Sequence, residues 1–392
     1  MRTIYADNAA TTAVSEKALA AMLPHFRESF GNPSALYDCG QEAKKALEAS
    51  RRAIAGCIGA LGTEIYFTSG GTESDNWAIF GACHARRERG RHIISTEIEH
   101  SAVLRPLDKM RDRGYEVTLL KPDKNGLVTP GQLEDAIRSD TILVSIMTAN
   151  NVVGTVMPIR ELCETARRRR VIFHTDAVQA AGHIPINVRE LGVDLLSLSA
   201  HKFHGPKGVG ALFVRLALKP EPYIVGGGQE KGYRSGTENV PGAAGMAAAL
   251  LERAENMRAE TERLAAMRDR LIENTLKIPG VYLTGSPDKR LPGHASFVIE
   301  GGRDSAHLIN MLNEEGICAS SGSACSASSK EAPHVLTALG CDENTARGAL
   351  RISLSPYNTE EEIEIIGEKL PRLIGQFRSR REQKILRASA RR

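Results

Sequence analysis

The sequence predicts an α/β fold, in which a mostly parallel sheet flanked by helices is followed by a smaller α+β unit. Between residues 65 and 214, short apolar runs alternate with stretches of helical periodicity. Such an alternation is typical of parallel strands buried on both faces. A long stretch rich in Ala, Glu, Arg and Leu from Gly242 to Ile278 then predicts one bridging helix. We therefore expect a large domain at 15–255 and a small domain made of 1–14 and 256–392.

The elements follow from hydrophobic periodicity and from turn residues. In the large domain we expect helices at 15–30, 40–59, 72–87, 130–137 and 159–168. Strands are expected there at 65–68, 92–95, 116–120, 141–146, 171–176, 193–198 and 212–214. In the small domain we expect strands at 281–283, 295–299 and 350–354, and helices at 305–315 and 359–377.

Composition excludes several classes of protein. A formal net charge of +4 over 392 residues is too small to imply a nucleic-acid partner. Seven cysteines without CxxC spacing argue against a disulfide framework and against a metal site, and favour a reducing compartment. The start lacks the apolar core of a signal peptide and no run is long enough to span a membrane, so we expect a cytoplasmic protein. The arginine run 167–170 is interpreted as a solvated helix end, and the basic tail 378–392 as a frayed terminus.

One lysine and one aspartate carry the first functional hypothesis. Lys202 lies where an apolar run ends in a turn, within Ser199-Ala200-His201-Lys202. A desolvated lysine at such a place can act as an amine nucleophile, although a surface lysine beside a turn is the simpler interpretation. Asp176 also ends an apolar run, 202 − 176 = 26 residues earlier. Pyridoxal 5′-phosphate (PLP) requires a Schiff-base lysine and an acidic partner for its pyridinium nitrogen, so the pair suggests a PLP site.

Further polar residues follow other predicted strands, and the carboxyl ends of parallel strands meet at one edge of a sheet. Thr68-Ser69-Gly70-Gly71-Thr72 precedes a helix and could bind a phosphate there, while Thr72 with Asp75 also fits a capping box. His100, Asn150-Asn151 and Gln179 are expected at the same edge, although a single histidine is usually structural.

Two residues of the small domain are unusual for their surroundings. Cys325 lies in a run of Ser, Gly and Ala at about 319–333, where we expect an exposed and reactive thiol. Arg351 lies on an apolar strand and would be costly to bury unpaired. We expect a carboxylate partner for it, either a structural Asp or Glu or a substrate.

These motifs together resemble the NifS/IscS-like cysteine desulfurases, which are PLP enzymes of aminotransferase class V with PLP fold type I. The resemblance covers nearly the whole chain. It includes Ala6-Asp7-Asn8-Ala9-Ala10-Thr11-Thr12, Gly31-Asn32-Pro33-Ser34, the 68–74 loop, Glu99-His100, Asp176-Ala177, Ser199-Ala200-His201-Lys202, Gly205-Pro206-Lys207-Gly208, Gly226-Gly227-Gly228-Gln229-Glu230, Arg234-Ser235-Gly236-Thr237, Ser320-Ser321-Gly322-Ser323-Ala324-Cys325 and Arg351-Ile352-Ser353-Leu354.

The resemblance implies a role for each site residue. The catalytic residues would be Lys202, Cys325 and His100, with Lys202 as the Schiff-base lysine and His100 stacked on the ring. The cofactor would be held by Gly71, Thr72, His100, Asn151, Asp176, Gln179, Ser199, His201, Lys202 and, from the other subunit of a homodimer, Thr237. The substrate would be held by Asn8, Asn32, Asn151 and Arg351, whose guanidinium fork suits a carboxylate.

The implied activity is conversion of L-cysteine to L-alanine, with the sulfur passing to Cys325 as a persulfide. Delivery would go to an iron–sulfur scaffold protein or another sulfur acceptor, whose cluster Cys325 could contact transiently. Some positions depart from the family pattern: Val152 replaces a glutamate, His204 a tyrosine, Pro356 a basic residue, and Gly293-His294 a pair of asparagines.

Three alternatives stay open. A selenocysteine lyase could share every residue of the site. A plain class V aminotransferase would have no use for Cys325. A sulfur-carrier or assembly subunit without catalytic activity is disfavoured because Lys202, Asp176, His100 and Cys325 are all present.

Overall fold

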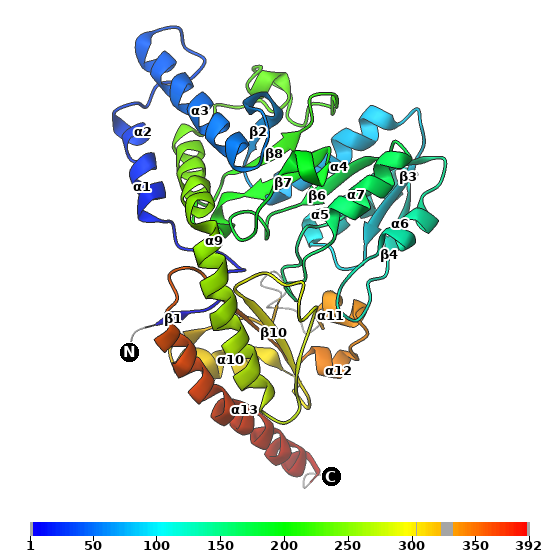
Figure 1. Ribbon diagram of the computed structural model, residues 1–392, viewed down its shortest axis with the longest axis vertical. Helices are drawn as coiled ribbons and strands as arrows, with labels where there is room; N and C mark the ends of the chain where they lie inside the picture. The colour runs from blue at the N-terminus through cyan, green and yellow to red at the C-terminus, as the bar shows by residue number, and fades with distance from the viewer. Residues whose placement is uncertain (1–2, 303, 323–331, 390–392) are drawn as a thin grey trace.

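The computed structural model describes residues 3–302, 304–322 and 332–389 and has two layered parts that share one long helix (Figure 1). The helix α9 (Val240–Leu276) has 37 residues and runs from the larger part into the smaller one. At 1.5 Å per residue it is about 55 Å long. The bridging helix predicted from the sequence is thus confirmed.

The larger part is built on a sheet of seven strands in the order β2-β8-β7-β6-β5-β3-β4. Their bounds are β2 (Ile65–Thr68), β3 (His92–Thr96), β4 (Glu116–Leu120), β5 (Thr141–Ser145), β6 (Ile172–Asp176), β7 (Leu195–Ser199) and β8 (Gly210–Val214). All neighbours are parallel except the two pairs that β8 makes with β2 and β7. The mostly parallel sheet of the predicted fold class is therefore present.

Helices cover both faces of this sheet, and its central strands are buried along their whole length. On one face α4 (Gly71–Arg86) and α5 (Ser101–Asp112) pack into one apolar cluster with strand residues such as Ile93 and Leu212. On the other face the apolar cluster joins α9 with helices α3 (Asp38–Cys57), α6 (Pro130–Ala136), α7 (Ile159–Arg168) and α8 (Val188–Leu191). The edge of the sheet at the carboxyl ends of its parallel strands is therefore formed by the loops that follow those strands.

The smaller part has its own apolar core, built from residues 4–6 and 264–377. Its strands are β9 (Val281–Leu283), β10 (His294–Ile299) and β12 (Ala349–Ser353) in the antiparallel order β12-β10-β9, with β1 (Ile4–Tyr5) beside β11 (Ile317–Cys318). Its helices are α10 (Ser305–Glu314), α11 (His334–Ala338), α12 (Glu343–Ala346) and α13 (Glu360–Ser389). We propose that the domain boundary lies in α9, near residue 255 as the sequence suggests.

Several helical elements differ from the prediction, and the short helices α8, α11 and α12 were not predicted. Residues 15–30 form two short helices, α1 (Glu16–Met22) and α2 (Pro24–Arg27), because proline favours the first turn of a helix and cannot continue one. Helix α5 was not predicted, although it continues across Pro106. Helix α13 extends beyond residue 377, where its prediction ended. Among the described helices, none is long and apolar enough to cross a membrane.

Candidate functional site

Lys202 and Asp176 lie at the same edge of the large sheet, as predicted. Asp176 is the last residue of β6, and Lys202 lies in the short 3-10 helix η2 (Ala200–Lys202), which follows β7. The Lys202 ammonium donates hydrogen bonds of 2.7 Å to the carbonyl oxygens of Ala9 and Ala10. Gln179 donates to the Ala9 carbonyl as well, at 2.9 Å. The N-terminal segment around Ala9 and Ala10 therefore covers this edge of the sheet, where it contacts both Lys202 and Gln179.

The start of α4 forms the second part of the site. Gly70 is the N-cap residue and provides no side-chain hydrogen bond, so the capping box of Thr72 and Asp75 is wrong. A Cβ atom on Gly71 would lie 2.6 Å from a methyl group of Val178 and 3.5 Å from the Cβ of Ser199. Only glycine leaves room there, and the first amides of α4 stay directed at the space beside the Ser199 hydroxyl. An uncapped helix start of this kind binds phosphate well.

Burial controls the charges behind this site. Burial raises the pKa of Asp176, and the nearby His100 and Lys202 oppose that rise. Burial also lowers the pKa of His100, against the opposing effect of Asp176, so the imidazole is mainly neutral at pH 7. Its Nδ1 accepts a hydrogen bond from the amide of Ala102 at 3.1 Å, which leaves Nε2 to carry the proton. His100 is therefore a neutral imidazole at the N-cap of α5.

A layer of buried acids supports the site from below. Asp75, which the capping box would have placed at the surface, is buried, and its Oδ1 lies 3.6 Å from His174 Nε2. Burial raises the pKa of Asp75 well above its usual value, and Asp176 adds to the rise. Burial likewise raises the pKa of Glu99 to about 8. Burial therefore favours the neutral form of both carboxyls, which limits the negative charge beside Asp176.

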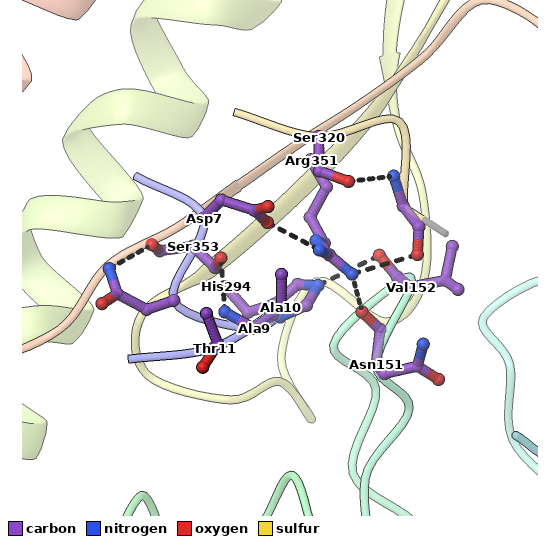
Figure 2. A network of polar contacts seen from close by, with 12 residues as sticks. Asp7, Ala9, Ala10, Thr11, Asn151, Val152, His294, Ser320, Arg351 and Ser353 are labelled. Atoms are coloured by element: carbon purple, nitrogen blue, oxygen red, sulfur yellow. Dashed lines mark hydrogen bonds and ion pairs between the residues drawn. The ribbon is translucent and has the colours of Figure 1, made fainter. Parts of the chain in front are cut away.

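Arg351 on β12 already has a carboxylate partner within the chain (Figure 2). Its Nη2 lies 2.6 Å from Asp7 Oδ1, and its Nη1 donates to the carbonyls of Asn151 at 2.7 Å and Gly322 at 3.0 Å. The side chain is 2% exposed, and its buried Nε has no partner among the described residues. Of the two partners that the sequence allowed, the structure supplies the structural aspartate. The guanidinium joins the two parts of the molecule.

The other predicted substrate residues divide into two groups. Asn151 adjoins Arg351 through its backbone, whereas the Asn8 amide donates to Ser353 O at 2.9 Å and is part of the connection between β1 and β12. Asn32 accepts a hydrogen bond from its own loop at Ser34 N and is exposed. That loop, between α2 and α3, lies beside the larger part of the molecule, well away from β1 (Figure 1). Within one chain, Asn32 is not brought to Arg351.

The remaining predicted cofactor residues lie around the same edge or next to it. His201 contacts Thr11 at 3.1 Å, and burial lowers the pKa of His201 to about 4. Thr72 is exposed in the first turn of α4. Thr237 is exposed at the end of a segment fixed to α4 by the ion pair of Arg234 with Glu73, at 2.8 Å. Cys325 lies outside the described residues.

Two departures from the family pattern contact one another. His294 Nε2 lies 3.0 Å from the carbonyl oxygen of Val152, and both residues are about 2% exposed (Figure 2). A third departure, His204, adopts a left-handed φ of 68° and stacks edge-on against Tyr357 at 4.7 Å. Pro356 accepts a hydrogen bond from Arg263 through its carbonyl, which any residue could do.

The sequence analysis missed His334, Asp7 and Glu99 as parts of the site. His334, the first residue of α11, lies 3.1 Å from the backbone oxygen of Glu99 and close enough to His100 to lower its pKa. The sequence pattern could not predict the contact of His334 with Glu99, because 235 residues separate the two.

Comparison with known proteins identifies the family. The model of the aminotransferase class-V family matches residues 4–366. The chain belongs to this family. It is 47% identical over 378 residues to the cysteine desulfurase IscS of Methanosarcina thermophila, covering 96% of this chain and 93% of that protein. It is also 47% identical to the cysteine desulfurase IscS of Dictyoglomus turgidum, with 96% of each chain covered.

Solved structures agree with the class V assignment. A NifS-like protein superposes with a TM-score of 0.89 at 38% identity, covering 95% of this chain and 99% of the other. A structure described as SspA in complex with cysteine gives a TM-score of 0.80 at 38% identity and covers 91% and 100%. The predicted resemblance to NifS/IscS-like enzymes is thus confirmed.

PLP is the cofactor of this class V enzyme, and the residues at the sheet edge fit it. The uncapped helix start with its glycine-only space matches a phosphate, Lys202 supplies an amine, and Asp176 a carboxylate for a ring nitrogen. Because His100 lies within the electrostatic reach of both Asp176 and Lys202, an aromatic surface stands at the same place.

Proposed function

We propose that this protein is a cysteine desulfurase, which converts L-cysteine to L-alanine and keeps the sulfur as a persulfide on Cys325. The observation that carries the proposal is the gathering of Lys202, Asp176 and the start of α4 at one sheet edge of a class V enzyme. The names of its relatives, and a neighbour in complex with cysteine, support that substrate.

The proposed roles of the residues follow from their surroundings. PLP, when bound, supplies an electron sink for the negative charge that develops at the substrate Cα. Asp176 would keep a proton on the ring nitrogen of the cofactor, and the amides of α4 with Ser199 would hold its phosphate. Lys202, at 2.7 Å from two carbonyl oxygens, is placed to receive and return the Cα proton.

His100 and Arg351 act on the attacking thiol and on the substrate, respectively. A neutral imidazole can accept the proton of a thiol, so the lowered pKa of His100 suits a general base for the Cys325 sulfhydryl. Arg351 would orient the substrate carboxylate with the guanidinium face that carries its unpartnered Nε, while Asp7 holds the opposite end. Asn151 and Gln179 complete the set as neighbours of ring and substrate.

Sulfur transfer is assigned to Cys325. Its thiolate attacks the sulfur of the bound cysteine, the Cβ–Sγ bond breaks with its electron pair left on the carbon fragment, and protonation of that fragment gives alanine. The product on the enzyme is a Cys325 persulfide, which a thiol of an iron–sulfur scaffold protein or another acceptor removes. A thiol with an ordinary pKa near 8.5 needs a base to become a thiolate, and His100 is the base that we propose.

The proposal includes a cytoplasmic homodimer. Thr237 and Asn32 are exposed and do not reach the site of their own chain, and each would complete the site of the other subunit. Exposed apolar side chains of the loop between α2 and α3, which are Phe30, Leu36 and Tyr37, provide a surface for that contact.

The test measures alanine and persulfide from L-cysteine with the wild type beside Cys325→Ala. We expect the variant to bind PLP and to bind cysteine as the wild type does, but to form little protein-bound persulfide. Persulfide formation undiminished in Cys325→Ala would remove this residue from the mechanism. Alanine release that is absent in the wild type would instead favour the carrier subunit.

A further inference from the structure

A basic pocket lies at the amino end of the large sheet, away from the site described above. It has a volume of about 420 Å³, within the range of small-molecule sites. It is lined by five arginines and one carboxylate: Arg86, Arg89, Arg167, Arg170, Arg215 and Asp194. Between these charges, Ile172 and Leu218 form an apolar floor.

The pocket forms where helices from both faces of the sheet end together. Arg86 closes α4 on one face, and Arg167 lies in the last turn of α7 on the other. The strand β6 begins at Ile172 beside them and ends at Asp176. Four residue steps along β6 separate the pocket from the proposed catalytic edge by about 13 Å, so this is a separate site.

Both oxygens of Asp194, the carboxylate that lines the pocket, already accept hydrogen bonds within the chain. One oxygen of Asp194 accepts from the Arg215 Nε at 3.1 Å, and the other from the amide of Phe173 at 3.0 Å. Among the described residues, the guanidinium groups of Arg86 and Arg170 have no hydrogen-bond or ion-pair partner, and those of Arg89 and Arg167 each donate only to a backbone carbonyl, at 3.0 and 2.8 Å. Four guanidinium groups therefore face the pocket without an anion.

Helix ends alone do not account for this arrangement. Arginines in a last turn complement the helix dipole, which suits Arg86 and Arg167. Arg89 and Arg170 lie beyond their helices, however, and Arg215 follows a strand. The arginine run 167–170 divides accordingly: Arg168 and Arg169 both pair with Glu134 on α6, at 3.6 and 3.5 Å, while Arg167 and Arg170 face the pocket. All four arginines of the run are exposed at the end of α7, as expected of a solvated helix end, and two of them also face the pocket.

We propose that this pocket binds a small polyphosphate, either as inorganic polyphosphate or as the phosphate chain of a nucleotide. Guanidinium groups bind phosphate oxygens in pairs of parallel hydrogen bonds, and clustered arginines repel one another until an anion arrives. A monovalent anion would leave most of this charge uncompensated, which favours a ligand with several phosphates.

The test is calorimetric titration of the PLP-loaded enzyme with sodium tripolyphosphate, ATP without metal, adenosine, and hexaglutamate. Chloride is held at about 50 mM so that screening does not hide the contact. The PLP absorbance band, followed in parallel, shows that the catalytic phosphate site stays filled. We expect tripolyphosphate and ATP to bind and adenosine and hexaglutamate not to. Tighter binding of ATP would identify the nucleotide as the source, and equal binding the inorganic chain.

Two double variants with the same change of charge decide the location. R86Q/R89Q removes two arginines that face the pocket, whereas R168Q/R169Q removes two neighbours that pair with Glu134. Tripolyphosphate affinity should fall about tenfold or more in the first and less than about threefold in the second. Both should keep the far-ultraviolet circular dichroism and the cysteine-dependent activity of the wild type. Equal losses in both variants, no binding by the wild type, or binding of hexaglutamate alone would overturn the proposal.

Discussion

The ion pair of Asp7 with Arg351 provides the most direct test of how the N-terminal segment is held within the smaller part of the molecule. Asp7 follows β1 and Arg351 is on β12, so the contact joins two segments that lie 344 residues apart in the sequence. The 2.6 Å distance links a guanidinium that is 2% exposed with a carboxylate that is 18% exposed. In Asp7→Asn the shape and one acceptor oxygen stay, but the negative charge is lost.

The cost follows from burial. Removing one partner of a buried ion pair costs about 3–5 kcal/mol, because the other charge stays buried and uncompensated. The asparagine retains a neutral hydrogen bond, roughly half as strong as the charged one, and Asp7 is partly solvated. We therefore expect the free energy of unfolding of Asp7→Asn to be about 2–3 kcal/mol below that of the wild type.

A matched control is Asp140→Asn, whose 2.9 Å pair with Arg138 has both side chains 42% exposed. An exposed pair contributes at most about 1 kcal/mol, so this variant should be near the wild type. Urea unfolding is followed by circular dichroism and by fluorescence of the single tryptophan, Trp77, which is buried against the large sheet. Equal losses in the two variants would refute the reasoning, since burial would then not distinguish them.

Two further predictions concern the site. Glu99→Gln should gain stability relative to the wild type as pH rises from 4.5 towards 8, because burial raises the pKa of Glu99 to about 8 and the carboxyl of the unfolded chain ionises first. The gain in the free energy of unfolding approaches about 1.4 kcal/mol per pH unit in urea unfolding, and a difference that does not change with pH would contradict it. Gly71→Ala should weaken PLP binding about tenfold or more in absorbance titrations, because its Cβ would lie 2.6 Å from Val178. The control Gly56→Ala, whose Cβ would have no atom within 4 Å, should leave PLP binding unchanged. Equal affinities of the two variants for PLP would show that the space at Gly71 can accommodate a side chain.

The fold could be predicted from the sequence wherever local pattern decides it. Continuous apolar runs such as Thr141–Ser145 occur only where a strand is covered on both faces, so the parallel sheet was predicted with its helices. Local pattern failed at prolines. Pro24 ends α1 and begins α2, whereas Pro106 is accommodated within α5 by packing against the sheet.

The site could be predicted in part. Lys202, Asp176 and the start of α4 each follow a strand, and a parallel sheet brings such positions together. Contacts between distant segments were not predictable. The contact of Asp7 with Arg351 depends on how the two segments of the smaller part pair, and that of His334 with Glu99 depends on how the smaller part packs on the larger one. The charges of Asp75 and Glu99 likewise follow from burial, which residue type alone does not reveal.

The central claim, that Lys202 holds the cofactor at the edge shared with Asp176, is tested by borohydride reduction of the PLP-loaded enzyme. Reduction fixes the pyridoxyl group to the lysine that carries it, and peptide mapping by mass spectrometry then locates that lysine. The account predicts the label on the peptide that contains Lys202 and its loss in Lys202→Ala. A label on another lysine, or on none, would contradict it.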